Sequence, residues 1–211
     1  MAVVRVRQHV NPLSERYQAP VARPAWEQVY RRPHQPLHLD MGCGKGIFLL
    51  QMAQLQPEWN FLGLEIRQPV VEQAQKRQQA DGLENLHFLF GNVNISFRSL
   101  MESWGDRNPL QQVSIQFPDP WFKKRHQKRR VLQPALVNDL AEFLPTGGRV
   151  VIQSDVESVA WEMVQRLASQ GQFQRQGQGW LAASPFPAQT DRERVTLAQG
   201  LPVYRAIFVR Q

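Results

Sequence analysis

The sequence of 211 residues is poor in the features that mark secreted, membrane-spanning and zinc-dependent proteins. Its single cysteine, Cys43, excludes an internal disulfide. No apolar run approaches the roughly 18 residues of a membrane-spanning helix, and Met1–Val10 lacks the apolar segment of a secretory signal. The histidines form no metal set, because Pro36 separates His34 from His38 and one cysteine cannot complete a zinc site. We therefore expect a soluble cytoplasmic protein that neither associates with a membrane nor binds a metal ion.

What the chain does have is enough apolar sequence for a core and a focused positive charge. Hydrophobic residues make up 42%, and the net charge is +7. Residues 1–36 hold six arginines and two glutamates, and residues 121–130 hold six lysines or arginines and no acid. These two segments carry +4 and +6, so the other residues sum to −3. A solvated helix face normally mixes signs, whereas clustered cations are typical of a polyanion contact, so we favour nucleic acid as the partner.

Strands and helices are predicted to alternate after an N-terminal arm. Residues 1–36 contain five prolines and little apolar periodicity, which predicts an arm that lies on a folded body or orders on binding. Residues 37–211 are predicted to form one domain with a mainly parallel sheet covered on both faces. The expected strands are residues 37–41, 60–65, 86–91, 113–117, 149–153 and 203–211, and the expected helices are 47–56, 69–80, 131–144 and 155–169. Ser154 and Glu157 fit a capping box for the last helix.

A glycine-rich loop follows the first strand, where ligands of such sheets bind. Gly42, Gly44 and Gly46 follow Asp40. A dinucleotide fingerprint needs a different glycine spacing, and a phosphate-binding loop needs Ser or Thr after its lysine, so neither fits. At the end of the second strand, Glu65 is placed to accept hydrogen bonds from ribose hydroxyls, or it is a solvent-facing acid.

Two further positions follow the next strands. Asn92 is placed either to meet an adenine edge or to serve a turn. Asp119 lies between Pro118 and Pro120 and is followed by Trp121. The prolines restrict the backbone on both sides, so this carboxylate is expected to be held rigidly beside the ligand crevice. A rigid carboxylate beside an aromatic ring can hydrogen-bond the edge of a nucleobase, and the alternative is a structural turn with Trp121 in the core.

The loop GCGKG, the strand ending at Glu65 and above all the string FPDPWFKKRHQKRR resemble the tRNA (guanine-N7-)-methyltransferase family of class I S-adenosylmethionine-dependent enzymes. The resemblance runs from Leu37 to the end of the chain. It implies an α/β, Rossmann-like fold with a mainly parallel seven-stranded sheet in a single domain over 37–211. It also implies transfer of a methyl group from S-adenosylmethionine to N7 of a variable-loop guanosine, at tRNA position 46, with S-adenosylhomocysteine as product.

The resemblance implies roles for particular residues. Asp119 is the catalytic residue and also a cofactor contact. The other expected cofactor contacts are Asp40, Gly42, Gly44, Gly46, Glu65 and Asn92, and the expected substrate contacts are Lys123, Asp155, Thr190, Asp191, Arg192 and Glu193. The cations expected on tRNA phosphates are Lys124, Arg125, Lys128, Arg129 and Arg130. Asp40 stands where the family often has Glu, and Asn92 where it usually has Asp.

Alternative interpretations stay open at several of these positions. Asp155 could be a helix-start residue, and Thr190 with Glu193 could be a capping box on an exposed turn. The whole chain could be a methyltransferase for a small molecule or a protein, or an RNA-binding module without catalysis. The first alternative predicts activity that survives deletion of the basic run, and the second predicts tRNA binding without cofactor binding. The sequence leaves the oligomeric state open between monomer and homodimer.

Overall fold

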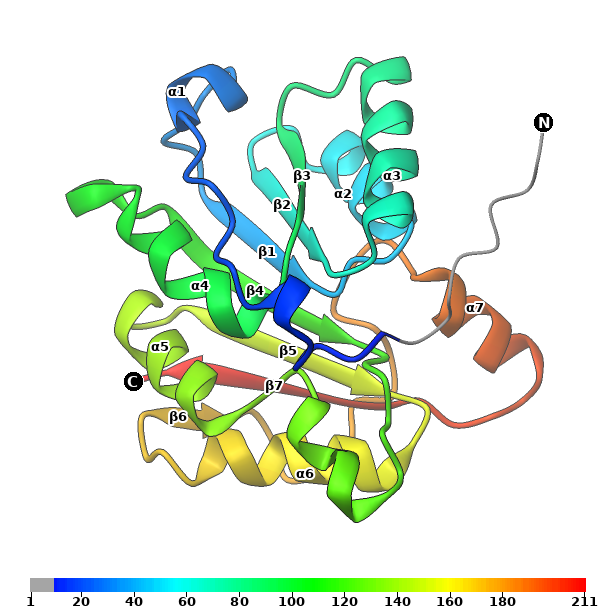
Figure 1. Cartoon of the computed structure of the whole chain (residues 1–211). Coiled ribbons are helices and arrows are strands. Elements are labelled where there is room, and N and C mark those ends of the chain that lie inside the picture. Colours follow the sequence, from blue (N-terminus) through cyan, green and yellow to red (C-terminus); the bar gives the residue numbers. More distant parts are fainter. Residues whose placement is uncertain (1–9) are drawn as a thin grey trace.

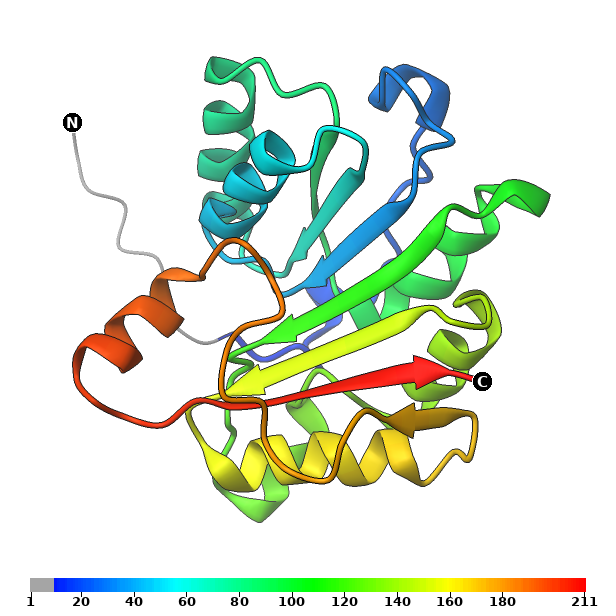
Figure 2. The same ribbon diagram turned by 180° about the vertical axis from the view of Figure 1, so that it is seen from behind.

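The computed structural model describes residues 10–211, which form one twisted sheet between layers of helices (Figures 1 and 2). The strands lie in the order β3-β2-β1-β4-β5-β7-β6. Their bounds are β1 Leu37–Met41, β2 Asn60–Glu65, β3 Leu86–Phe90, β4 Leu110–Gln116, β5 Arg149–Ser154, β6 Phe173–Arg175 and β7 Tyr204–Arg210. The expected seven-stranded sheet with helices on both faces is confirmed, but the sheet is mixed and not mainly parallel throughout, because β7 runs antiparallel to both of its neighbours, β5 and β6.

The strand order reverses beside β1, which pairs with β2 on one side and β4 on the other. The connections that follow these neighbouring strands turn to opposite faces of the sheet, which opens a crevice at the carboxyl ends of the strands. The glycine loop after β1 and the Pro-Asp-Pro segment after β4 both begin at this edge.

Helices cover both faces of the sheet because each face carries its own apolar cluster. One cluster packs the helices α2 and α3 against residues such as Phe61 and Phe88, and the other packs α4, α5 and α6 against residues such as Leu39 and Val113. The helix bounds are α1 Trp26–Val29, α2 Ile47–Leu55, α3 Gln68–Ala80, α4 Val93–Glu102, α5 Pro134–Phe143, α6 Glu157–Ala168 and α7 Asp191–Ala198, with 3-10 helices η1 Glu15–Tyr17, η2 Gly105–Arg107 and η3 Lys124–Arg129. No helix among the described residues is long and apolar enough to cross a bilayer.

The segment 10–36 packs on the body through aromatic side chains. Trp26 stacks on Trp104 with ring centroids 4.4 Å apart, and the Tyr30 hydroxyl donates to the carbonyl of Phe61 at 3.0 Å. Val21 lies so close to Gly91 that a Cβ there would meet it at 2.2 Å. These contacts place the described part of the arm beside α4, and its functional separation from 37–211 stays a proposal.

The predicted capping box at the start of α6 is wrong. Helix α6 begins at Glu157, and the Ser154 hydroxyl accepts from the N–H of Val156 at 3.1 Å. Ser154 is the last residue of β5, so it lies too far from the first helical turn to cap it. Asp155 lies two residues before the first helical residue, Glu157, so it is not the N-cap of α6, which is Val156.

Candidate active site

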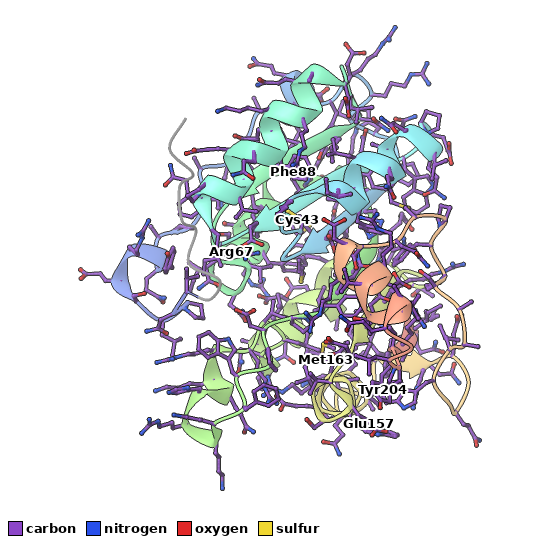
Figure 3. All side chains as sticks on the ribbon, turned by 90° about the vertical axis from the view of Figure 1, so that its right-hand side faces the viewer. Cys43, Arg67, Phe88, Glu157, Met163 and Tyr204 are labelled. Atoms are coloured by element: carbon purple, nitrogen blue, oxygen red, sulfur yellow. The ribbon has the colours of Figure 1, made fainter. Side chains whose placement is uncertain are left out.

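The glycine loop turns back sharply and fits tightly under α3. Gly42, Gly44 and Gly46 have positive φ angles of 85°, 56° and 72°, a conformation that disfavours residues with a Cβ. A Cβ on Gly46 would lie 2.5 Å from the ring of Phe88. Figure 3 labels Phe88, Cys43 and Arg67 along this side of the molecule. Gly46 is therefore required by backbone geometry and by packing, not by ligand contact alone.

Asp40 is a buried carboxylate at the end of β1, held by the neighbouring strand β4. Its Oδ1 accepts from the Ser114 hydroxyl at 2.6 Å and from the Gln116 amide at 3.1 Å. Burial raises the pKa of Asp40 to about 6, against the lowering effect of these two hydrogen bonds, and the nearby charge of Glu65 adds to the rise. A carboxylate so desolvated gains strongly from a cationic ligand group.

His38 is linked to Asp40 through the hydroxyl of Ser114. Its Nε2 lies 2.8 Å from the Ser114 hydroxyl, which itself donates to Asp40, so Nε2 carries the proton. Gln112 then donates to Nδ1 at 3.3 Å. Burial lowers the pKa of His38 to about 3, so this imidazole is neutral. The sequence analysis did not find Ser114 or Gln116, although both lie on the predicted strand 113–117 with alternating side-chain direction.

Glu65 ends β2 as expected, and its carboxylate is surrounded by donors. It accepts from the N–H of Gly44 at 3.0 Å, from the N–H of Arg67 at 3.0 Å and from the Arg67 guanidinium at 2.9 and 3.1 Å. The pKa of Arg67 is raised, chiefly by its hydrogen bond to Glu65, and the charges of Glu65 and Asp119 add to the rise. The sequence analysis missed Arg67, although it lies only two residues after Glu65.

Asn92 caps α4 and touches the N-terminal segment. Its Oδ1 accepts from the N–H of Asn94 at 3.1 Å, which matches the turn interpretation, and its Nδ2 donates to the carbonyl of Pro12 at 3.1 Å. An aspartate could make the first bond but not the second, because an ionised carboxylate has no donor. Asn92 also lines a cavity with Glu65, so the two interpretations of this residue are compatible.

The Pro-Asp-Pro segment is held between two strained residues. Phe117 and Trp121 have φ angles of +49° and +42°, a region that costs bulky side chains on the order of 1–3 kcal/mol each. Asp119 lies between them and lines two cavities at once. Strain of this kind persists only where the surroundings over-determine the backbone, so the segment is rigid as the two prolines suggest.

Two cavities meet at Asp119 and bring the expected site residues together. The first, between β1, β2 and the start of α4, is lined by Gly42, Glu65, Asn92, Asp119 and Arg129 among others. The second lies toward α7 and is lined by Asp40, Gly44, Asp119, Asp155, Thr190, Asp191 and Arg192 among others. Lys123 lines neither cavity and lies on the surface as the residue that precedes η3.

The basic segment, residues 121–130, forms η3 beside these cavities. Lys123, Lys124, Arg125 and Lys128 are exposed. Arg130 differs, because its guanidinium is buried and bonded to the carbonyl of Pro120 at 2.8 Å and to Glu162 of α6. A phosphate cannot reach a guanidinium held in this way without breaking these bonds, so the structure places Arg130 apart from the exposed cations.

The expected substrate contacts around α7 fall into two groups, because most of them line the second cavity and Glu193 is buried in the protein. Asp155 pairs with Arg192 at 2.8 Å on the cavity wall. The Thr190 hydroxyl accepts from the N–H of Glu193 at 3.0 Å and so caps α7. Glu193 itself is only 1% exposed and bonds to Arg205 of β7 at 2.7 Å, so the alternative of a capping box on an exposed turn is wrong for this residue. Its carboxylate turns into the core instead of back to its own helix.

Comparison with known proteins shows what this chain is similar to. Residues 34–206 match a family model described as putative methyltransferase. The tRNA (guanine-N(7)-)-methyltransferase of Trichormus variabilis is 55% identical over 208 residues, covering 98% of this chain and 96% of that protein. The protein with the same name from Microcystis aeruginosa is 56% identical, and the alignment covers 99% of both chains.

Solved structures share the fold at low sequence identity. TrmN from Thermus thermophilus aligns with a TM-score of 0.58 at 16% identity, over 84% of this chain and 45% of that one. A precorrin-6y C5,15-methyltransferase from Geobacter metallireducens aligns with a TM-score of 0.56 at 11% identity, over 83% and 80% of the two chains. At these identities the structures bear on the fold alone, which is the α/β fold of S-adenosylmethionine-dependent methyltransferases.

Proposed function

This chain belongs to the tRNA (guanine-N(7)-)-methyltransferase family, and we propose that it methylates N7 of a guanosine in the variable loop of tRNA, at position 46. The methyl donor is S-adenosylmethionine, and S-adenosylhomocysteine is the product. The observation that carries the proposal is the place of Asp119, which lines both the cavity beside Glu65 and the cavity beside Asp155. One carboxylate thus faces the space for a donor and the space for an acceptor.

The residues around the glycine loop fit the chemistry of S-adenosylmethionine; Gly42 lines both cavities, whereas Asp40 and Gly44 line the second. Asp40 offers a buried carboxylate to an ammonium group, and the glycine loop offers a close backbone approach without a phosphate-binding helix start. Glu65 offers oxygens to ribose hydroxyls, but Arg67 and Gly44 now occupy those oxygens. We assign Glu65 to the ribose on the condition that the Arg67 guanidinium moves aside, because a carboxylate accepts only about four hydrogen bonds.

The reaction asks the protein to position groups and to stabilise charge. When bound, S-adenosylmethionine supplies a methyl group whose carbon accepts the N7 lone pair while the bond to sulfur breaks and its electron pair stays on sulfur. Guanine N7 carries no proton, so no residue has to act as a base. The methylated ring is cationic, and we assign Asp119 to orient the guanine and to stabilise this charge.

Contacts to tRNA are assigned to two groups of side chains, the exposed cations of the basic segment and residues that line the second cavity. Lys123, Lys124, Arg125 and Lys128 are assigned to phosphates, which predicts steep salt dependence. Asp155, Thr190, Asp191 and Arg192 are assigned to the substrate because they line the cavity. Glu193 is assigned an indirect role, since its buried carboxylate holds α7 in place.

The target guanine has to leave a stacked helix before it can react. N7 faces the major groove, which is deep and narrow in A-form RNA and closed to side chains. Phe122 lines the second cavity and is 72% exposed, which is unusual for a large apolar side chain. We assign its ring to stack on an unpaired base near the target.

The cellular setting follows from the substrate. We propose that the protein acts in the cytoplasm, because its proposed substrate is a tRNA. Monomer and homodimer are both compatible with a site built from one chain. Among the described residues, no group of three or more His, Cys, Asp and Glu side chains is arranged to hold a metal ion.

The test is incubation with labelled S-adenosylmethionine and an unmodified tRNA transcript, followed by mapping of the methylated nucleotide. We expect label at N7 of the variable-loop guanosine and none when that guanosine is replaced by adenosine. Label on a small molecule or protein but not on tRNA would favour the first alternative function. Cofactor-independent tRNA binding without label transfer would favour a module without catalysis.

A further inference from the structure

The six cations of the basic segment divide into two groups by what their side chains contact. The first group is exposed and consists of Lys123, Lys124, Arg125 and Lys128. The second group, Arg129 and Arg130, turns toward the Pro-Asp-Pro segment. The division follows the geometry of η3, a short helix that presents one side to solvent and the other to the protein.

Arg130 ties the segment to α6. Its Nε–H donates to the carbonyl of Pro120, the residue directly after Asp119, at 2.8 Å. Its Nη1 pairs with Glu162 of α6, and Glu162 also accepts from Arg166 of the same helix at 2.6 Å. The carbonyl of Pro120 is therefore linked through two side chains to a helix that packs on the sheet.

Arg129 covers the aromatic ring at the other end of the segment. Its guanidinium carbon lies 4.9 Å from the centre of the Trp121 ring, and the His126 ring meets the same ring edge-on at 5.9 Å. The Arg129 Nε is buried and has no hydrogen-bond partner, which fits a guanidinium that packs against the Trp121 ring. Desolvation and the charges of Arg129 and Arg125 lower the pKa of His126, which favours the neutral ring.

The segment needs such supports because its backbone is strained. Phe117 and Trp121 adopt positive φ angles, and each would relax toward a more favoured conformation if nothing held it. The start of the segment is held by the N–H of Phe117, which donates to the carbonyl of Gln153 at 2.8 Å. Arg130 holds the backbone just after Asp119 through the carbonyl of Pro120, and Arg129 packs on Trp121 at the end of the segment. Loss of either contact would therefore move Asp119.

We propose that Arg129 and Arg130 are positioning residues for Asp119, and that among the six cations of the basic segment only the four exposed ones bind tRNA phosphates. This inference rests on the proposed function, because it concerns how that site keeps its carboxylate in place. It changes the expected role of Arg129 and Arg130 from polyanion contact to loop support. It also gives Glu162 of α6 a part in holding the catalytic carboxylate in place.

The proposal is tested by measuring tRNA binding against salt together with turnover. Each neutralised phosphate contributes about 0.7–0.9 to the slope of log binding constant against log salt concentration. Arg130→Met is expected to leave this slope unchanged and to lower kcat at least tenfold. Lys124→Gln, the exposed control, is expected to reduce the slope by about that unit and to raise KM for tRNA more than it lowers kcat. The proposal is overturned if Arg130→Met reduces the slope as Lys124→Gln does.

Two further variants keep the test valid should Arg130→Met fold poorly. Glu162→Gln removes the acid that holds Arg130, and it cannot remove a phosphate contact; we expect a lower kcat with unchanged or tighter tRNA binding. Arg129→Lys keeps the charge but loses the planar face that covers Trp121, and we expect the same pattern. Unchanged kcat in both would overturn the proposal, and melting temperatures would separate loss of fold from loss of positioning.

The outcome is separable from that of the proposed function. If the wild-type protein methylates no tRNA, the proposed function fails, whereas the salt slopes still show which cations neutralise phosphates. If the wild-type protein methylates N7 but the Arg129 and Arg130 variants lose slope instead of turnover, only the positioning role fails.

Discussion

The carboxylate of Glu193 on α7 forms an ion pair with the guanidinium of Arg205 on β7, with 2.7 Å between Oε1 and Nη2 and both side chains buried. Gln153 donates to the second oxygen of Glu193 and also to Gln116, which in turn donates to Asp40. A buried chain of hydrogen bonds therefore runs through the sheet from Asp40, on the wall of the second cavity, to α7. It explains how a helix that extends from the edge of the molecule keeps its place beside the proposed active site (Figure 1).

Breaking this pair is expected to destabilise the protein. Arg205→Met leaves the Glu193 charge buried without its partner, which costs about 3–5 kcal/mol and corresponds to a fall in Tm of roughly 10 °C. Arg194→Met is the matched control, because Arg194 pairs with Asp191 on the same helix but is 58% exposed. Exposed pairs contribute about 1 kcal/mol or less. Thermal unfolding measures the loss of stability in both variants. Equal losses would contradict the prediction that the buried pair contributes more than the exposed pair.

Asp119→Asn should separate turnover from cofactor affinity. The amide keeps the shape of the side chain but removes the negative charge that supports the cationic product ring, so we expect kcat to fall by roughly 100-fold. The dissociation constant of S-adenosylhomocysteine should change by only a few-fold, since Asp40 and Glu65 keep their charges. Calorimetry and single-turnover assays give the two numbers. Equal turnover in both proteins would refute the role.

Cofactor affinity should depend on pH through Asp40. Because burial raises its pKa to about 6, the carboxyl is mostly protonated at pH 5 and ionised at pH 7. Only the ionised form attracts an ammonium group, so S-adenosylhomocysteine should bind about tenfold more weakly at pH 5 than at pH 7. His38 stays neutral throughout, because its pKa is lowered to about 3. Asp40→Asn should abolish the pH dependence, and a flat profile for the wild type would contradict the assignment.

Gly46→Ala is expected to be more harmful than an alanine at another glycine with similar backbone. The new Cβ would lie 2.5 Å from Phe88 and would occupy a φ of +72°, so strain and overpacking together cost about 2–5 kcal/mol. Gly82 has a φ of +62° but nothing within 4 Å of an added Cβ. Gly82→Ala should therefore lose only the strain contribution of about 1–2 kcal/mol. Denaturant unfolding compares the two, and an equal loss would mean that Phe88 moves aside.

Phe122→Ala tests the stacking surface at the second cavity. A base that stacks on an aromatic ring contributes about 1–3 kcal/mol, so we expect KM for tRNA to rise at least fivefold and Phe122→Trp to restore it. Leu55→Ala is a control at another exposed apolar residue, on α2. Melting temperatures should stay unchanged because the Phe122 side chain is exposed. An unaltered KM would remove Phe122 from the site.

The sequence alone determined the order of most strands and helices and the edge at which the site lies. The predicted strand 37–41 and the predicted start of the helix at residue 47 agree with the structure, because alternation, apolar periodicity and glycines act locally. Helix α4 was missed although Asn92 is a residue type favoured at a helix N-cap, because Asn92 was interpreted only as a ligand contact or a turn residue. The short strand β6 was missed because it has only three residues.

The tertiary structure decided which polar side chains meet. Asp40 and Ser114 are 74 positions apart, Arg130 and Glu162 are 32 apart, and Glu193 pairs with a residue on a strand that runs against its neighbours. In the sequence, Arg130 looks like any other cation of its run and Glu193 like any exposed helix acid. Only the packing of distant elements desolvates such groups, and desolvation makes a charge take a protein partner instead of a ligand or water.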